Sequence, residues 1–479
     1  MHVRSRWRAV SAYLILCFVA LSPLAGCRGK AAQQPSTKPS ARQAALTPEQ
    51  RQKNVESFDY VWNTIKDKHW DPTLGGLDWN AVRDELRPKV EQAQTMAQAR
   101  HAMGDMIDRL KQSHFGIIPA SVYDDVDAKA DASKDAPAAQ VTAPRKSRDG
   151  TIGVGVRLID DKAVITNVDP QLTAARAGVK PGWEVVAVDG HKVAPLVKRL
   201  RANLPDNNMK RTMLTASLGA VVHGPVGESA TFTFRDGRGR NVKRPIAFAQ
   251  PSGTKATFGH MPTMYVDFES RRLAPANVGY VAFKPFLDPE MVMTKFAAAM
   301  EQFKDADGVI LDLRGNPGGL GAMAMGIGNF FVTKPNQRLG TMNSRTGALN
   351  FVLNPRAGAY EGPLAVLVDE MSMSTSEILA GGLQDLGRAK VFGTRTPGAA
   401  LPSLVERLPN GDGFQYAIAN YTSTGGKPLE GSGVTPDVAV PLDRSSLLHG
   451  HDPVIDAAVA WIESQKKNKP DPTRTLEKP

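Results

Sequence analysis

The sequence predicts an α/β protein with a layered core that follows a helical domain and a β-rich domain. Strand patterns alternate with helix patterns between residues 262 and 442, which is typical of a layered α/β domain. Short apolar runs separated by turn residues fill residues 150–250 and indicate a β-rich domain. Apolar residues recur at helical spacing in 55–70 and 80–110, so two or three helices are expected there.

The first residues have the pattern of an export signal. Three arginines precede an apolar run at residues 12–21, which is too short to remain as a membrane-spanning helix. The sequence 24-LAGC-27 follows and resembles a bacterial lipobox, which implies that Cys27 carries the lipid anchor after removal of residues 1–26. An ordinary signal with a chance cysteine is the alternative. Arg28 is not the aspartate that retains some lipoproteins at an inner membrane, so an outer-membrane site facing the periplasm is expected where two membranes exist.

Composition divides the remainder of the chain. A Pro-, Ser- and Ala-rich stretch reads as a flexible tether, and a second stretch without apolar period reads as a linker. The expected parts are a tether at 27–46, a helical domain at 47–127, a linker at 128–149, a β-rich domain at 150–250, an α/β core at 251–442 and a carboxy-terminal tail at 443–479.

The charge and the cysteines exclude several classes of protein. The net charge is +11, but the Lys and Arg are scattered and not interleaved with aromatics, so no nucleic-acid partner is expected. Cys17 lies in the signal, which leaves the mature chain without a disulfide. There is no HExxH motif, and His449 and His451 lie in a polar stretch, so neither a metal nor another cofactor is expected.

Two stretches in the α/β region point to chemistry. In 371-MSMSTSEILAGG-382, Ser374 lies between a predicted strand and helix, where free N–H groups and the helix dipole favour a nucleophile. Ser374 with Glu377 also fits a capping box, so this stretch alone leaves both interpretations open. The second stretch, 312-DLRGNPGG-319, follows another strand and offers glycine N–H groups to a ligand, without the ending of a P-loop.

Together with 431-GSGVTPDV-438, these stretches resemble the core of the tail-specific serine peptidases. That superfamily comprises carboxy-terminal processing proteases, tricorn core proteases and interphotoreceptor retinoid-binding protein modules. The resemblance spans about residues 50–442 and implies a ClpP/crotonase-like core. It also implies a serine endopeptidase that acts on unfolded or carboxy-terminal segments, with Ser374 as nucleophile. A non-catalytic ligand- or peptide-binding protein on the same scaffold is the alternative.

The resemblance also bears on the base that activates the serine. Carboxy-terminal processing proteases use a downstream lysine, but Ala399 stands at that position, and Lys390 lies in a predicted strand away from the motif. Tricorn-like members instead have a Ser-His pair after the amino-terminal helices and a glutamate before the Gly-Val-x-Pro-Asp motif. This similarity implies a catalytic set of Ser113, His114, Ser374 and Glu430.

Two further sets of backbone groups are implied. The oxyanion donors would be the N–H of Thr375 and that of either Gly318 or Gly319, a choice that the sequence leaves open. The β-rich region resembles a PDZ domain, in which a glycine-rich loop holds the carboxy terminus of a peptide. The corresponding loop residues are Gly153, Val154, Gly155 and Val156. The expected partners are therefore polypeptides bound through their carboxy termini, and a membrane through the lipid anchor.

Overall fold

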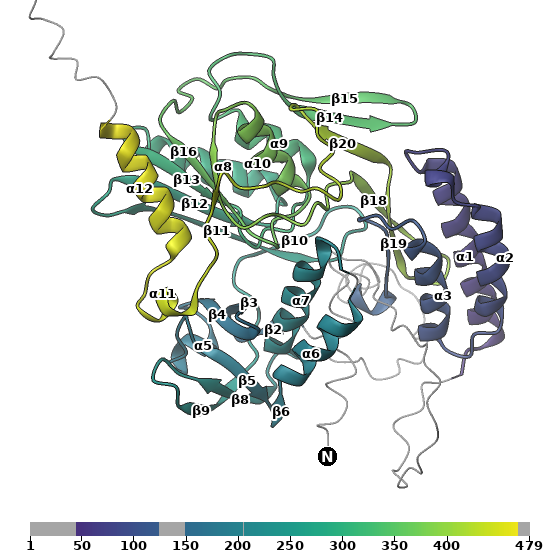
Figure 1. Cartoon of the computed structure of the whole chain (residues 1–479). Coiled ribbons are helices and arrows are strands. Elements are labelled where there is room, and N and C mark those ends of the chain that lie inside the picture. Colours follow the sequence, from purple (N-terminus) through teal and green to yellow (C-terminus); the bar gives the residue numbers. More distant parts are fainter. Residues whose placement is uncertain (1–44, 124–148, 205, 468–479) are drawn as a thin grey trace, which may run out of the picture.

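The computed structural model describes residues 45–123, 149–204 and 206–467, which form a helical part, a middle domain (residues 150–250) and an α/β core (Figure 1). The expected signal, Cys27 and most of the expected tether and linker lie outside the described residues.

Three helices form the amino-terminal part: α1 (Pro48–Lys68), α2 (Trp79–Glu91) and α3 (Met96–Asp108). Each begins after a capping side chain, namely Thr47, Asp78 or Thr95. At Thr47 the cap is reciprocal, because Gln50 N–H donates to Thr47 Oγ1 over 3.1 Å while Thr47 N–H donates to Gln50 Oε1 over 2.9 Å.

These helices share their apolar core with strands from much later in the chain. The three-stranded sheet β1-β19-β18 consists of β1 (Gly116–Ile118), β19 (Gly413–Ala417) and β18 (Ser403–Arg407). Phe58, Leu86 and Met103 are fully buried in one cluster with Phe414 and Tyr416 of β19. The turn between α3 and β1, which contains the Ser-His pair, is therefore fixed against the last third of the chain.

The main sheet of the middle domain has the order β3-β4-β5-β8-β9, with β6 paired to β5, and β2 and β7 form a separate two-stranded sheet. The strands of the domain are β2 (Gly150–Thr151), β3 (Val154–Ile159), β4 (Lys162–Val168), β5 (Glu184–Val188), β6 (His191–Lys192), β7 (His223–Gly224), β8 (Ser229–Arg235) and β9 (Asn241–Ala247). Its helices are α5 (Thr173–Arg176), α6 (Ala194–Asn203) and α7 (Met209–Gly219). The sequence analysis did not predict α6 and α7, because the apolar runs on either side favoured strands; α7 packs beside the edge strand β3.

The core is a seven-stranded sheet in the order β10-β11-β12-β13-β16-β17-β21. It consists of β10 (Thr254–Ala256), β11 (Met264–Leu273), β12 (Val278–Lys284), β13 (Gly308–Asp312), β16 (Leu364–Val368), β17 (Lys390–Gly393) and β21 (Val438–Ala439). The first three strands are antiparallel, and those from β12 to β21 are parallel. Both β13 and β16 are buried along their whole length, as expected for central strands covered on both faces.

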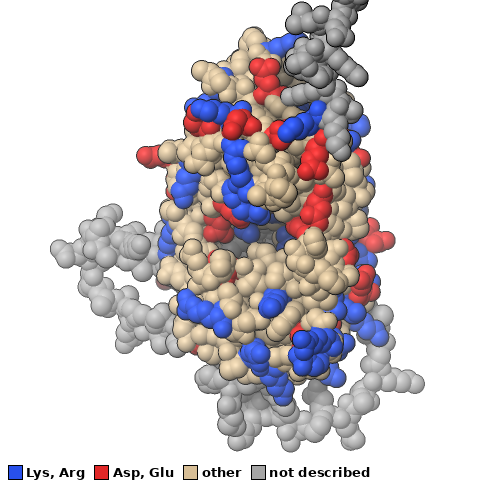
Figure 2. Space-filling model, turned by 90° about the vertical axis from the view of Figure 1, so that its left-hand side faces the viewer, with Lys and Arg blue, Asp and Glu red and all other residues tan. Residues whose placement is uncertain are grey.

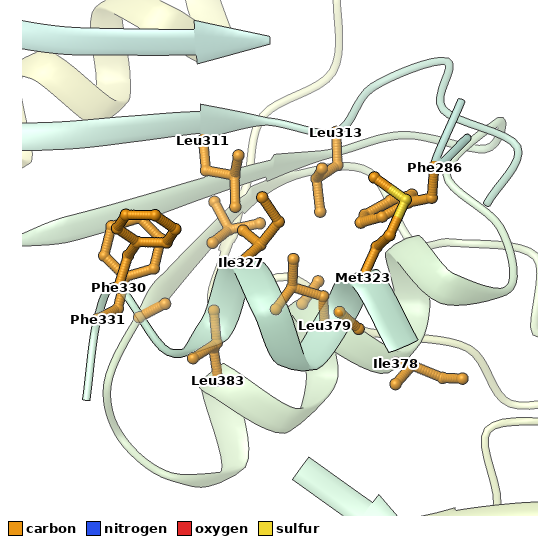
Figure 3. Close-up of a cluster of buried hydrophobic side chains, with 14 of the residues drawn as sticks. Phe286, Leu311, Leu313, Met323, Ile327, Phe330, Phe331, Ile378, Leu379 and Leu383 are labelled. Atoms are coloured by element: carbon orange, nitrogen blue, oxygen red, sulfur yellow. The ribbon is translucent and has the colours of Figure 1, made fainter. Parts of the chain in front are cut away.

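One face of this sheet is covered by α8 (Pro289–Gln302), α9 (Gly321–Gly328) and α10 (Thr375–Asp385), with a second sheet of β14 (Gln337–Ser344), β15 (Gly347–Leu353) and β20 (Ala419–Ser423) beyond them (Figure 1). Figure 3 shows Leu311 of β13 directed toward Ile327 of α9 and toward Leu379 and Leu383 of α10. The predicted α/β class with an amino-terminal helical part is confirmed.

The other face of the sheet is covered by the last helix, which corrects the expected carboxy-terminal tail. Residues after 442 form α11 (Arg444–Leu448) and α12 (Pro453–Lys467). Val454, Ala458 and Ile462 of α12 pack against Ile310 and Leu367 of the sheet. These apolar residues recur at helical spacing, so the signal was present in the sequence.

The fold brings two loops together. Residues 313–319 follow β13 and residues 369–374 follow β16, and these two strands are parallel neighbours. Their carboxyl ends therefore meet at one edge of the sheet, where α/β proteins place their sites. None of the described helices combines the length and apolarity needed to cross a bilayer.

Candidate active site

Ser374 stands directly before α10 in a strained backbone conformation, with φ 54° and ψ −117°. A non-glycine residue rarely adopts a positive φ, and such strain persists only where the surroundings hold it. Here the N–H of Ser374 donates to the carbonyl oxygen of Ala399 over 2.8 Å and to Glu377 Oε2 over 3.1 Å. These two hydrogen bonds hold the backbone of Ser374 and thereby set the direction of its side chain.

The glycine turn after β13 lies against this serine. A Cβ atom on Gly318, where φ is 91°, would lie 2.7 Å from Ser374 Cβ, so only glycine permits the approach. The N–H of Gly318 donates to Asn316 Oδ1 over 3.0 Å. Within the described residues, no hydrogen bond engages the N–H groups of Gly319 and Thr375. Of the two glycines that the sequence left open, Gly319 is thus the one with a free donor.

Ser113, His114 and Glu430 form a continuous hydrogen-bonded chain. Ser113 Oγ lies 2.7 Å from His114 Nδ1 and 2.8 Å from Glu430 Oε2, and Ser113 N–H donates to Glu430 Oε1 over 2.8 Å. Glu430 Oε2 also accepts the N–H of Ala400 over 3.2 Å. Ser113 and Glu430, which are more than 300 positions apart in the sequence, are therefore directly hydrogen-bonded. The packing of the amino-terminal helices against β19 brings the two segments together.

The available protons determine which group donates and which accepts in each of these hydrogen bonds. An ionised Glu430 only accepts, so the single hydroxyl proton of Ser113 points to it. Ser113 Oγ must then accept from His114, which places the imidazole proton on Nδ1. His114 Nε2 is left with a free lone pair, as a proton acceptor requires.

His114 and Ser374 line the same cavity of about 400 Å³. In the described structure no hydrogen bond joins His114 to Ser374 Oγ, although catalytic hydrogen bonds often tighten only when substrate is bound. The rest of the wall is mainly apolar and comes from the segment before β11, the turn after β12, the glycine turn and β18. Its apolar side chains are Phe258, Met261, Met264, Pro285, Leu287, Pro317, Leu320, Met373, Leu404 and Val405.

Comparisons with known proteins match two parts of the chain to family models. Residues 277–440 match the family model of peptidase family S41, and residues 50–108 match that of the tricorn protease C1 domain. The chain therefore carries a peptidase family S41 domain. It is a serine-type peptidase, a hydrolase that acts on polypeptides.

Relatives of this S41 peptidase include two curated proteins. The chloroplastic C-terminal processing peptidase of Tetradesmus obliquus is 24% identical over 390 residues, which cover 80% of this chain and 76% of the relative. The carboxyl-terminal-processing protease of a Picosynechococcus species is 24% identical over 411 residues, which cover 84% of this chain and 86% of the relative.

Solved structures of low sequence identity share the fold. The photosystem II D1 C-terminal processing protease aligns with a TM-score of 0.51 and 21% identity, over 87% of this chain and 97% of that chain. Mature CPAF aligns with a TM-score of 0.54 and 13% identity, also over 87% of this chain and 97% of that chain.

Ala399 stands where the resemblance to carboxy-terminal processing proteases implied a lysine, and it contributes only backbone atoms to the site. Ala399 is buried, and its N–H donates to Glu377 Oε2 over 2.9 Å while its carbonyl holds Ser374. Lys390 lies on β17, with its ammonium 5.8 Å from the centre of the Trp461 ring, and it does not line the cavity.

Burial shifts three titratable groups of the S41 site. It lowers the pKa of His114 to about 4, so the imidazole is neutral at pH 7. Burial also raises the pKa of Glu430. It raises the pKa of Glu377 to about 7, against the opposing effect of hydrogen bonds from Thr396 and from three backbone N–H groups.

Three supporting contacts were missed by the sequence analysis or interpreted only in part. Glu377 was considered only as a cap, but it also accepts the N–H of Gly398 over 2.7 Å and so holds the Ala399 loop. Asp369 accepts the N–H of Gly315 over 2.9 Å and is bound by Arg157 of the middle domain, whose Nε lies 2.9 Å from Asp369 Oδ2. No sequence signal links Arg157 to the glycine turn, because only the tertiary structure places β3 there.

The loop Gly153–Val156 begins the edge strand β3, where Val154 pairs with Val168 of β4. It does not line the Ser374 cavity. On the core side of α7, Thr212 Oγ1 donates to the carbonyl oxygen of Glu370 over 2.7 Å. The region between β3 and α7 therefore borders the turn that precedes the nucleophile. No cluster of three metal-ligating side chains occurs among the residues that the structure describes.

Proposed function

We propose that this S41 peptidase is an endopeptidase that cleaves unfolded or carboxy-terminal segments through an acyl-enzyme on Ser374, with His114 as the base. The observation that carries the proposal is the shared cavity of Ser374 and His114, behind which the Ser113–Glu430 chain holds the imidazole.

In the proposed first step, Ser374 Oγ attacks the scissile carbonyl carbon while its proton moves to His114 Nε2. The carbonyl oxygen becomes negatively charged in this step and accepts hydrogen bonds from the free N–H groups of Gly319 and Thr375. Collapse of the tetrahedral intermediate breaks the C–N bond, and His114 returns the proton to the leaving amine. A water molecule then attacks the acyl-enzyme by the same route and releases Ser374.

The Ser113–Glu430 chain matters because His114 becomes positively charged in this step. Burial disfavours the charged imidazole, which is why its pKa is low. The Ser113 hydroxyl carries the effect of the Glu430 carboxylate to Nδ1 and lowers the cost of the imidazolium at the transition state.

The cavity supports an extended substrate with an uncharged side chain near the cleaved bond. Among the described residues no Lys, Arg, Asp or Glu lines it, and β18, which contributes three residues from Ser403 to Val405, is the edge strand of its sheet. An extended peptide pairs readily with such an edge. We also propose that Gly153, Val154, Gly155 and Val156 select carboxy termini in the manner of a PDZ domain, a role in keeping with the names of the curated relatives.

Export and lipidation at Cys27 complete the proposal and are supported by the sequence pattern alone. Replacing Cys27 by alanine is expected to release the protein from membranes or to block its maturation. Cell fractionation together with the mass of the mature amino terminus measures this. An unchanged fractionation with no lipid mass on the wild-type protein contradicts it.

A fluorophosphonate probe distinguishes the peptidase from a non-catalytic binding protein. We expect the probe to label the wild-type serine and to leave Ser374→Ala unlabelled. Ser403→Ala is the matched control, because Ser403 lines the same cavity and its hydroxyl accepts from Gln415 instead of facing a base. Labelling that persists in Ser374→Ala, or an unreactive wild type, refutes the proposed nucleophile.

A further inference from the structure

The middle domain carries most of the net charge of the protein. Residues 150–250 contain 15 Lys and Arg against 8 Asp and Glu, a formal charge of +7 out of +11 for the whole chain. The sequence analysis treated these cations as scattered. On the face that Figure 2 shows, the Lys and Arg in the lower part of the molecule have few acidic residues between them, whereas both signs are mixed in the upper part.

Two segments of the middle domain form one side of this charged region. Residues 172–183 cover α5 and the turn after it, and residues 235–247 cover the β8–β9 turn and β9; together they hold seven Lys and Arg and a single acid, Asp236. Arg244 joins them, because its Nε donates to the carbonyl oxygen of Ala177 over 3.1 Å. We define the basic face as the following six residues. They are Arg176, Lys180, Arg238, Arg240, Lys243 and Arg244.

Most of the basic face has no counter-charge. Among the described residues, the six cations of the basic face form one ion pair, between Arg240 and Asp236 at 3.0 Å. Lys180, Arg238 and Lys243 are exposed, and their charged groups contact no described acid. Uncompensated cations on two adjoining segments attract an anionic partner over about 10 Å at ordinary ionic strength.

We propose that the basic face docks the protein on an anionic lipid surface. The inference rests on the envelope location proposed above, and it is independent of the catalytic mechanism. A chain anchored at Cys27 can hold Ala45, the first described residue, at most about 60 Å from the membrane. Free to reorient within that distance, the protein turns its most positive face toward the headgroups, each cation adding about 1 kcal/mol at a typical anionic membrane.

The face lacks the features that favour the other anionic partner, a nucleic acid. Single strands are bound by exposed aromatic rings between the cations. Trp183, the only aromatic residue of 172–183, is partly buried and packs on Phe234 at 6.0 Å between ring centres. The large apolar side chains that are exposed among the described residues all lie outside both segments. They are Tyr60, Val226, Phe258, Leu349 and Leu404.

Vesicle flotation tests the proposal with protein that begins at Ala45, so that neither signal nor lipid contributes. The wild type is expected to float with phosphatidylcholine vesicles that contain phosphatidylglycerol and to stay behind with pure phosphatidylcholine. Raising the salt from about 0.1 M to about 1 M, which shortens the screening length from about 10 Å to 3 Å, is expected to abolish the binding.

Charge variants locate the surface. The combination of Arg176→Gln, Lys180→Gln, Arg238→Gln and Lys243→Gln is expected to lower the partition coefficient at least about tenfold. The matched control changes four exposed lysines elsewhere by the same total charge: Lys66, Lys89, Lys334 and Lys427, each to Gln. Both proteins should hydrolyse a small activated ester at the wild-type rate without vesicles, which shows that they are folded.

Several outcomes overturn the proposal. Equal losses in the two quadruple variants would show that net charge, not this face, matters. Equal flotation of the wild type with neutral vesicles would show binding that does not depend on lipid charge. Stronger, face-dependent binding to DNA of random sequence than to the anionic vesicles would assign the face to a nucleic acid instead. If the wild type does not hydrolyse the ester at all, the proposed function is contradicted, but the vesicle result can still be interpreted.

Discussion

Replacing Glu430 by glutamine tests the chain from Glu430 to His114, because the two side chains have the same shape but different donors. Glu430 accepts three hydrogen bonds, from Ser113 N–H, Ser113 O–H and Ala400 N–H. Glutamine offers one oxygen and one NH2 group, so it cannot accept all three. If the oxygen remains on the Ser113 backbone N–H, the NH2 group faces Ser113 Oγ and donates to it.

The reversed hydrogen bond between residue 430 and Ser113 Oγ also reverses the hydrogen bond between Ser113 and the imidazole of His114. The Ser113 hydroxyl then donates to His114 Nδ1, and the imidazole proton moves to Nε2, where it blocks acceptance of the Ser374 proton. In serine proteases the analogous aspartate-to-asparagine change, which produces the wrong tautomer, lowers kcat by about 10⁴. We expect a loss of about 10²- to 10⁴-fold in acylation for Glu430→Gln.

Ser113→Ala is the matched comparison, because it removes the connecting hydroxyl without forcing the wrong tautomer. Losing a hydrogen bond to a charged group costs about 1.5–3 kcal/mol, or about 10- to 150-fold in rate. Single-turnover acylation by a fluorogenic ester measures both variants, and circular dichroism verifies their folding. The reasoning is refuted if folded Glu430→Gln acylates as fast as the wild type, or faster than Ser113→Ala.

The remaining predictions concern the base, the glycine turn and the contact between domains. Acylation should fall as pH decreases, because a protonated His114 cannot accept a proton, with half the maximal rate near pH 4; a midpoint near 6.5 in the pH–rate profile contradicts the buried site. Gly318→Ala should lower kcat at least about 100-fold through displacement of Ser374, whereas Gly75→Ala, also at positive φ but with open space around it, should leave kcat unchanged. Arg157→Met leaves the Asp369 carboxylate buried without its cation, so urea titration should show a free energy of unfolding lower by about 3–5 kcal/mol; an unchanged value rules out the pair as a structural link.

The sequence by itself determined the fold class and the order of the parts. Alternation of strands and helices predicted the layered core, because buried parallel strands such as β13 and β16 are continuous apolar runs and their helices keep a helical period. The stretch around Ser374 left a helix cap and a nucleophile equally open, and the resemblance to the tail-specific peptidases, not the local pattern, made Ser374 the candidate. The helix α12 was missed although its apolar period was present, because the polar residues around it suggested a tail.

The tertiary structure alone decided how the site is assembled. Glu430 reaches Ser113 because the amino-terminal helices share a core with β19, a contact between distant segments that no local pattern records. The structure also separated Gly319 from Gly318, since a hydrogen bond to Asn316 occupies one of two adjacent N–H groups. Local propensity specifies helices, strands and turns, whereas hydrogen-bond partners and the distribution of charge over a surface depend on which segments pack together, and packing is decided by the whole chain.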